Sequence, residues 1–337
     1  MASRLSALIM LLSKLSFTNL RTAGKVLVRS GPAALFSPLI WLIFKRTDST
    51  FTENKNYFLE EEPLSEDTIG ETKVLFIVHI HFPEFVKRFQ KGVAKLSQDR
   101  WRYVVTSSNP KILEEIESAQ GLNGLPSVST MLLPNRGRNI SPFIEALREH
   151  GQGSEIIIHI HSKKSEHADP QLGRHWANIQ WGPLFENPEI VSRVLGVFKS
   201  NPEISIVYPA VEGLLSPWTY TWAANSKMAR RLLKPLGIAV KSWERIAFPA
   251  GGMFAARKMD LDYLEKMDLG PESFPNETGQ LDGQTQHAIE RLLGYVPEKT
   301  GKLHAIYLTK NDAFTSDTRT LTENYEWSSF GQKNTSH

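Results

Sequence analysis

Cysteine is absent from this chain of 337 residues. Its absence excludes disulfide bonds, thiolate metal sites and cysteine nucleophiles, and it is typical of a reducing compartment. Any bound metal ion would need His, Asp or Glu ligands. The net charge is also low, at +3, which is too little to indicate a nucleic-acid partner. The hydrophobic fraction of 41% is enough for a substantial core, so a disordered or fibrous class is excluded.

Long apolar runs are missing from the start of the chain. The runs "LSALIMLL" and "ALFSPLIWLIF" are shorter than the roughly 20 residues that a membrane-spanning helix needs, and Pro38 interrupts the second. No clear small-residue cleavage site follows the first run, which disfavours a secretory signal peptide.

Acidic residues are absent from residues 1–47, which carry only basic charged side chains. Apolar residues between scattered cations favour a helical segment that lies on the headgroups of an anionic membrane. An ordinary helical subdomain and an organelle transit peptide are the alternatives. Residues 48–71 are rich in Asp and Glu, which predicts a solvated linker. The remaining chain is expected to form a domain at 72–312 and a C-terminal tail at 313–337.

From Lys73 onward the strand and helix patterns alternate. The expected strands cover 73–82, 101–108, 128–134, 154–161, 204–213 and 248–261. The expected helices cover 83–98, 111–121, 141–151 and 226–237, with Ser141 capping the third and Gly151 ending it. This alternation predicts an α/β fold with a mostly parallel open sheet and helices on both faces. Ligands of such sheets bind beyond the carboxyl ends of the strands.

The stretch "IIIHIHSKKS" places polar side chains at such a strand end. His159 and His161 alternate along the strand and share one face, and Lys163 and Lys164 follow directly. Packing within the sheet explains a lone histidine, but the adjoining lysines favour a ligand site.

The loop "LPNRGRNISP" ends the preceding strand and enters a helix. Gly137 permits a tight turn, and Arg136 and Arg138 supply forked donors. The helix N-terminus adds partial positive charge. These features favour binding of an anion such as a diphosphate, whereas a surface loop with two arginines is the alternative.

The run "SPWTYTW" places Trp218, Tyr220 and Trp222 at alternate positions. Exposed rings of this kind can stack on the apolar face of a sugar. Core packing is an equally good interpretation for each ring.

Two carboxylates lie in a glycine-containing loop before the last predicted helix. Glu277 and Asp282 precede a helix that carries His287, Glu290 and Arg291. A loop exposes a carboxylate while the helix holds it, as a general base requires. A simple helix cap at Asp282 is the alternative.

Five motifs together resemble the rhamnan-synthesis protein F family of bacterial polysaccharide and O-antigen assembly proteins. In order, they are "VHIHFP", "LPNRGRNISPF", "IIHIHSKKSEH", "FPAGGMFAAR" and "GQLDGQTQHAIERLLG". The resemblance extends over about residues 73–306. It implies a GT-A-like glycosyltransferase domain that uses a nucleotide-sugar such as dTDP-rhamnose. The acceptor would be a cell-surface polysaccharide or lipopolysaccharide O-antigen, free or lipid-linked, and the enzyme would be cytoplasmic or peripheral to the inner face of the bacterial membrane.

The resemblance also implies roles for individual residues. The residues expected to bind the nucleotide-sugar are Asn135, Arg136, Arg138, Asn139, His161, Lys163, Lys164 and Arg291. Asp282, or else Glu277, would deprotonate an acceptor hydroxyl in a one-step, inverting displacement. The acceptor would stack on Trp218, Tyr220 and Trp222.

A metal is not essential to this interpretation. The stretch "HIHSKKS" stands where many GT-A enzymes carry a metal-binding Asp-x-Asp element. Lys163 and Lys164 would neutralise the leaving diphosphate, with or without Mn²⁺ or Mg²⁺ held by His159 and His161.

The sequence departs from the family pattern at three positions. Asn139 replaces the usual Asp, Gly252 the usual Ser and Ala255 the usual Trp. These changes bear on the identity of the donor sugar more than on the reaction class.

Two rival functions remain open. The missing acidic metal motif favours a non-catalytic module that binds a glycan or a nucleotide-sugar in an assembly complex. Two "HIH" triplets also permit a metal-dependent hydrolase with His79, His81, His159 and His161 as ligands.

Overall fold

The computed structural model describes residues 71–96, 101–120, 127–162, 178–211, 217–241, 244–277, 282–308 and 313–315. The predicted basic segment at 1–47, nearly all of the predicted linker at 48–71 and most of the predicted tail lie outside these residues. In the described ranges, no helix has both the length and the apolar character needed to cross a membrane.

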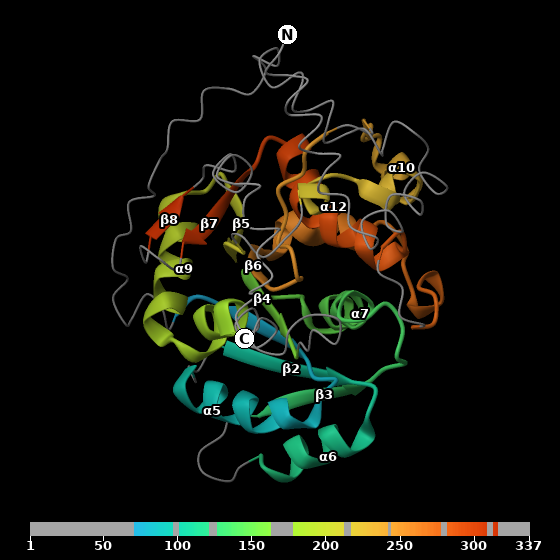
Figure 1. The fold of residues 1–337 in the computed structure, drawn as a ribbon. Helices are drawn as coiled ribbons and strands as arrows, with labels where there is room; N and C mark the ends of the chain where they lie inside the picture. Colours follow the sequence, from blue (N-terminus) through green and yellow to red (C-terminus); the bar gives the residue numbers. More distant parts are fainter. Residues whose placement is uncertain are drawn as a thin grey trace, which may run out of the picture.

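The described strands form one open, mixed sheet in the order β3-β2-β1-β4-β6-β5-β7-β8 (Figure 1). The strands are β1 (Val74–His79), β2 (Trp101–Ser107), β3 (Val128–Leu132), β4 (Ile156–His161), β5 (Ile204–Pro209), β6 (Phe254–Arg257), β7 (Leu303–Leu308) and β8 (Ala313–Thr315). Strands β3, β2, β1 and β4 pair in parallel, as do β5 and β7. The antiparallel strand β6 lies between β4 and β5, and β8 closes the other edge. The predicted mostly parallel sheet is confirmed. Because β8 pairs with β7, the sheet extends past residue 312, where the domain was predicted to end.

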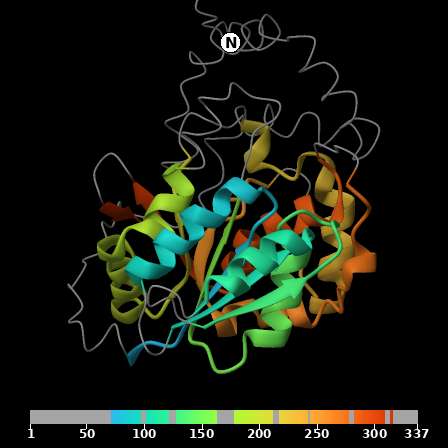
Figure 2. The same ribbon diagram turned by 90° about the horizontal axis from the view of Figure 1, so that it is seen from below.

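Helices cover both faces of the sheet, as predicted. One face carries α5 (Val86–Leu96), α6 (Pro110–Ser118), the π-helical segment η2 (Gly182–Glu186) and α9 (Pro188–Ser200). The other carries α7 (Ile140–His150), α10 (Ser226–Leu233), α11 (Asp262–Glu265) and α12 (Thr285–Lys299). The short 3₁₀ turns are η1 (Pro83–Phe85), η3 (Pro217–Tyr220), η4 (Ala223–Asn225), η5 (Lys234–Leu236), η6 (Lys258–Leu261) and η7 (Pro271–Ser273). Figure 2, which views the molecule from below, shows α5 and α6 in front of the sheet.

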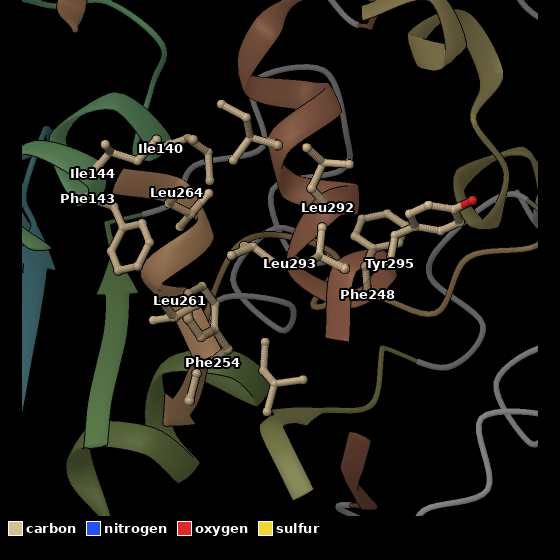
Figure 3. Close-up of a cluster of buried hydrophobic side chains, with 14 of the residues drawn as sticks. Ile140, Phe143, Ile144, Phe248, Phe254, Leu261, Leu264, Leu292, Leu293 and Tyr295 are labelled. Atoms are coloured by element: carbon tan, nitrogen blue, oxygen red, sulfur yellow. The ribbon is translucent and has the colours of Figure 1, made fainter. Parts of the chain in front are cut away.

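Alternating side chains divide the core into two clusters. In β1, Val74, Phe76 and Val78 pack under α5 and α9, whereas Leu75 and Ile77 pack against α7 and α12. Both sets are apolar because a parallel strand covered on both faces has no solvent side. Figure 3 shows the second cluster, in which side chains of α7, of residues 261–264 and of α12 lie together.

Helix α12 packs very closely on the segment before β6. A Cβ atom added at Gly294 would lie 1.8 Å from the carbonyl oxygen of Ala247. Only glycine permits this approach. It brings the first turns of α12 beside the turn that precedes β6, where the candidate site lies.

The N-cap of helix α7 lies two residues earlier than the predicted cap at Ser141. Asn139 is its N-cap, and the carbonyl oxygen of Gly137 accepts hydrogen bonds from the N–H groups of Ile140 and Ser141. Gly137 and Arg138 have φ angles of 65° and 54°, so the chain reverses before Asn139 and the first helical turn already includes Ile140. The predicted end at Gly151 is confirmed, since Gly151 is the C-cap.

Candidate functional site

The carboxyl ends of β1 and β4 lie side by side and carry histidines. His79 is the register partner of His161 in the parallel ladder. Side chains two positions apart share a face of a strand, so His79 lies on the face of Leu75 and Ile77, toward α7 and α12. His159 and His161 lie on that same face. The histidines therefore lie at the carboxyl ends of the strands, where the sequence analysis expected a ligand to bind.

The two β4 histidines hold a glycine turn at the start of β6. His159 Nδ1 lies 2.7 Å from the carbonyl oxygen of Gly252, and His161 Nε2 lies 2.6 Å from that of Gly251. A carbonyl oxygen only accepts, so both ring nitrogens carry the proton in these contacts. From the other side, the Gly251 N–H donates to Glu290 Oε1 of α12 at 2.7 Å. The turn is thus fastened to β4 and to α12.

Burial keeps the imidazoles of His79 and His159 neutral. Burial, followed by the neighbouring His161 and His81, lowers the pKa of His79 to about 3. Burial, followed by His161, also lowers the pKa of His159 well below its ordinary value. These two neutral rings act as hydrogen-bonding supports, and they add no positive charge for a diphosphate.

The described residues do not fit a divalent metal ion. The ring nitrogens of His159 and His161 that face the turn are protonated toward carbonyl oxygens, and Mg²⁺ and Mn²⁺ prefer oxygen ligands. Within the ranges that the structure describes, no group of three His, Asp or Glu side chains is arranged to hold a metal. The predicted ligand pair of His159 and His161 therefore has no third ligand among the described residues. The four-histidine hydrolase site is likewise not assembled among the described residues, and His79 Nδ1 contacts Thr106 Oγ1 at 3.0 Å.

The loop that follows β3 carries both predicted arginines, and each forms an ion pair. Arg136 Nη1 lies 2.7 Å from Glu272 Oε2, and Arg138 Nε lies 3.3 Å from Glu277 Oε2. An isolated β-bridge between Arg136 and Asn276 joins the same two loops. An incoming diphosphate would have to share these cations with carboxylates. Lys163 and Lys164, the other predicted cations, lie outside the described residues.

The two asparagines of this loop differ in their surroundings. Asn135 is exposed. Asn139 faces the glycine turn, because a Cβ atom added at Gly252 would lie 2.5 Å from Asn139 Nδ2. That nitrogen is buried without a hydrogen-bond partner. Asn139 thus reaches the same turn as His161, from the loop that follows β3.

Asp282 lies just before α12 in a network of donors. Asn225 Nδ2 donates to Asp282 Oδ1 at 2.7 Å, and the Ala224 N–H donates to Oδ2 at 3.1 Å. Burial raises the pKa of Asp282, but the Arg291 guanidinium, 3.5 Å away, and these hydrogen bonds together hold it below its ordinary value. The carboxylate is therefore charged at neutral pH. The alternative of a simple cap is wrong, since the N-cap of α12 is Gln284.

Arg291 is buried beneath this network. Its Nε donates to the carbonyl oxygen of Thr221 at 2.8 Å, and its Nη1 donates to that of His287 at 2.9 Å. Its guanidinium also lies over the Phe248 ring. This placement suits Arg291 to hold Asp282 in place rather than to contact a diphosphate itself.

Glu277, the second predicted carboxylate, is largely buried and lies beside α12. Gln286 Nε2 donates to Glu277 Oε1 at 3.1 Å, while Oε2 faces Arg138. Glu277 thus connects α12 with the loop that follows β3.

The predicted aromatic shelf is wrong for two of its three rings. Tyr220 and Trp222 are 2% and 0% exposed, and the Trp222 ring packs on Tyr295 of α12. Tyr220 lies in the 3₁₀ turn at residues 217–220, and Trp222 is the N-cap of the next turn. The core packing alternative holds for both rings. The side chain of Trp218 lies outside what the structure describes.

The sequence analysis named neither Asn225 nor Gln180 and assigned no role to Glu290. Asn225 binds Asp282, Glu290 binds the Gly251 N–H, and Gln180 Nε2 donates to the carbonyl oxygen of Ala250 at 2.7 Å. No local pattern marks Gln180 or Asn225. Glu290 stood on the predicted helix, but nothing in the sequence indicated its partner.

Comparison with known proteins identifies two curated relatives, both described as "Uncharacterized protein WxcX", from the B100 and ATCC 33913 strains of Xanthomonas campestris pv. campestris. Each is 29% identical over 201 residues, which is 59% of this chain. The matched region spans only 28% of the length of those relatives.

Among solved structures, the mannosyltransferase PcManGT from Pyrobaculum calidifontis, in complex with GDP-Man and Mn²⁺, is similar with a TM-score of 0.37 and 15% identity. The similarity covers 74% of this chain and 61% of that one. A likeness at this level does not establish a common fold.

The family comparison is more extensive. The model of the rhamnan synthesis protein F family matches residues 39–302. The match contains every described site residue named above and begins upstream of Lys73, where the motif resemblance started. Because it extends over more than half of the sequence, this chain belongs to the rhamnan synthesis protein F family.

Proposed function

We propose that this protein is a glycosyltransferase that moves a sugar from a nucleotide-sugar to a growing cell-surface polysaccharide or O-antigen. The observation that carries the proposal is the meeting of four elements at one edge of the sheet. The end of β4, the loop after β3, the turn before β6 and the start of α12 are joined there by His161, Asn139 and Glu290. Open α/β sheets bind ligands at this edge, and making a rhamnan requires glycosyl transfer.

The donor would lie across the ends of β1 and β4. Its diphosphate would be neutralised by Lys163, Lys164 and the arginines of the loop after β3, and Asn135, Asn139 and His161 would contact the nucleotide-sugar. We propose dTDP-rhamnose as the first donor to test. No step is assigned to a metal, because the described residues do not fit one.

The reaction would be a single displacement. The acceptor hydroxyl oxygen attacks the anomeric carbon, the bond from that carbon to the diphosphate oxygen breaks, and the hydroxyl proton passes to a carboxylate. Asp282 is the proposed base, because its lowered pKa keeps it charged. Attack from the face opposite the leaving group gives inversion.

The test is release of dTDP from dTDP-rhamnose by the purified full chain, with and without a rhamnose-containing acceptor glycan, followed by NMR analysis of the product anomer. Acceptor-dependent release with an inverted linkage supports the proposal. Stoichiometric binding of donor or glycan without any release would favour the non-catalytic binding module instead.

A further inference from the structure

Helix α10 presents a basic face to solvent. Lys227, Arg230, Arg231 and Lys234 are all exposed, at the spacing of one helical face. The opposite face, formed by Ser226, Ala229, Leu232 and Leu233, is buried against the core. The burial of one face holds the cations together on the other.

No acidic residue lies close to these cations in the sequence. The sequence has no Asp or Glu between Glu212 and Glu244, and Lys241 adds a fifth exposed cation. Within the described ranges, Lys227 and Lys234 form no ion pair. By contrast, Lys258 and Lys299 each form an ion pair with a carboxylate.

Partly exposed aliphatic side chains border the cations. Met228, Leu236, Ile238 and Val240 pack on the core with one side and remain half-buried. Residues 226–241 contain no aromatic side chain. Cations beside aliphatic groups suit the headgroup region of a bilayer. Binding of single-stranded nucleic acid relies on aromatic stacking, which this surface lacks.

The basic face adjoins the candidate site. Asn225 immediately precedes α10, and its side chain binds Asp282 at the start of α12. Figure 1 shows α10 on the outer side of α12, across the molecule from α5 and α6. A membrane that contacts α10 would therefore lie close to the Asp282 end of the site.

We propose that the exposed face of α10 and η5 docks the protein on an anionic lipid bilayer. This surface is distinct from residues 1–47, and its binding does not depend on glycosyl transfer. The membrane contact would hold the site near an acceptor that is itself attached to lipid.

The first test is co-sedimentation of the full chain with phosphatidylglycerol-containing vesicles and with pure phosphatidylcholine vesicles, in the absence of donor. The variant K227Q/R231Q/K234Q is expected to bind anionic vesicles about 100-fold more weakly, since each basic residue near such a surface contributes about 1 kcal/mol. The matched control K87Q/K91Q/K95Q removes three exposed lysines from α5, on the opposite face of the sheet. It is expected to bind as the wild-type chain does.

Wild-type binding by the α10 variant, or equal loss in both variants, overturns the proposal. The proposal is also overturned if K227Q/R231Q/K234Q loses binding of a fluorescent oligonucleotide but binds anionic vesicles as the wild-type chain does. A second measurement needs no variant: anionic vesicles should protect Lys227 and Lys234 from acetylation by a soluble reagent, but not Lys87 or Lys91. Equal labelling of all four lysines with and without vesicles contradicts membrane docking through α10.

Discussion

Asn225 and Asp282 bind each other's segments in both directions. Asn225 Nδ2 donates to Asp282 Oδ1 at 2.7 Å, and the N–H of Gly283 donates back to Asn225 Oδ1 at 3.1 Å. The two residues stand at the starts of α10 and α12, far apart in the sequence. This exchange fixes the proposed base in place and joins the two helices at the site.

The first prediction separates the chemical role of Asp282 from its structural one. Asp282→Asn should abolish transfer, and it should lower the free energy of unfolding by about 2 kcal/mol because Arg291 loses its countercharge. Asn225→Ala should lower stability by about 1 kcal/mol but retain measurable transfer, since the carboxylate remains. Both are checked by urea unfolding and by product formation at saturating donor. Full turnover in Asp282→Asn would remove Asp282 as the base.

The second prediction concerns acid stability. His79 has a folded-state pKa of about 3, below the ordinary value of 6.5, so the unfolded chain binds a proton first as the pH falls. Above pH 6.5, His79 is neutral in both the folded and the unfolded chain, and it does not lower the free energy of unfolding. Between pH 6.5 and pH 3, proton binding by the unfolded chain lowers the free energy of unfolding by about 1.4 kcal/mol per pH unit. His79→Asn keeps a polar atom near Thr106 and removes the imidazole that takes up the proton. The variant should show a shallower decline in unfolding free energy between pH 6 and pH 4, measured by urea titration, and an unchanged slope would contradict the assignment.

The third prediction tests the glycine turn. Gly252 has φ of 77°, and a Cβ there would approach Asn139 Nδ2 to 2.5 Å. Gly252→Ala should therefore cost about 1–3 kcal/mol of stability and reduce donor binding, because Asn139 must move. Gly237→Ala is the matched control, since Gly237 has φ of 67° with no atom within 4 Å of an added Cβ. Equal loss in the two variants would show that backbone strain alone matters. Replacing Asn139 with Ala in the Gly252→Ala background should restore part of the lost stability.

The fourth prediction concerns the ion pair between Arg138 and Glu277. The Arg138 side chain is 42% exposed, so breaking the pair should change stability by less than about 1 kcal/mol. If Arg138 binds the diphosphate, Glu277→Gln should release the guanidinium and tighten binding of dTDP, whereas Arg138→Ala should weaken it. Calorimetric titration with dTDP checks both, with Arg148→Ala as a control in a surface pair with Glu145. The two substitutions must change the affinity for dTDP in opposite directions. If both raise it or both lower it, Arg138 is excluded from the donor site.

Much of the fold was predictable because its signals are local. The apolar run of β4, the amphipathic pattern of α5 and the glycine at the end of α7 each mark an element within a few residues. The cap of α7 was misplaced because the reversal at Gly137 and Arg138 depends on packing against Phe274, far along the chain. Tyr220 and Trp222 were misjudged because their spacing does not reveal that both rings are buried in the core, where Trp222 packs on Tyr295 of α12.

The sequence by itself determined the α/β class, the two-faced sheet and the segments that reach its ligand edge, since hydrophobic periodicity decides which face of an element is buried. Only the tertiary structure decided the partners of the polar side chains. Asp282 meets Asn225, Glu290 meets Gly251 and Arg138 meets Glu277, all across sequence separations that no local pattern records. Hydrogen bonds and ion pairs need contact within a few ångströms, and chain folding alone brings such residues together.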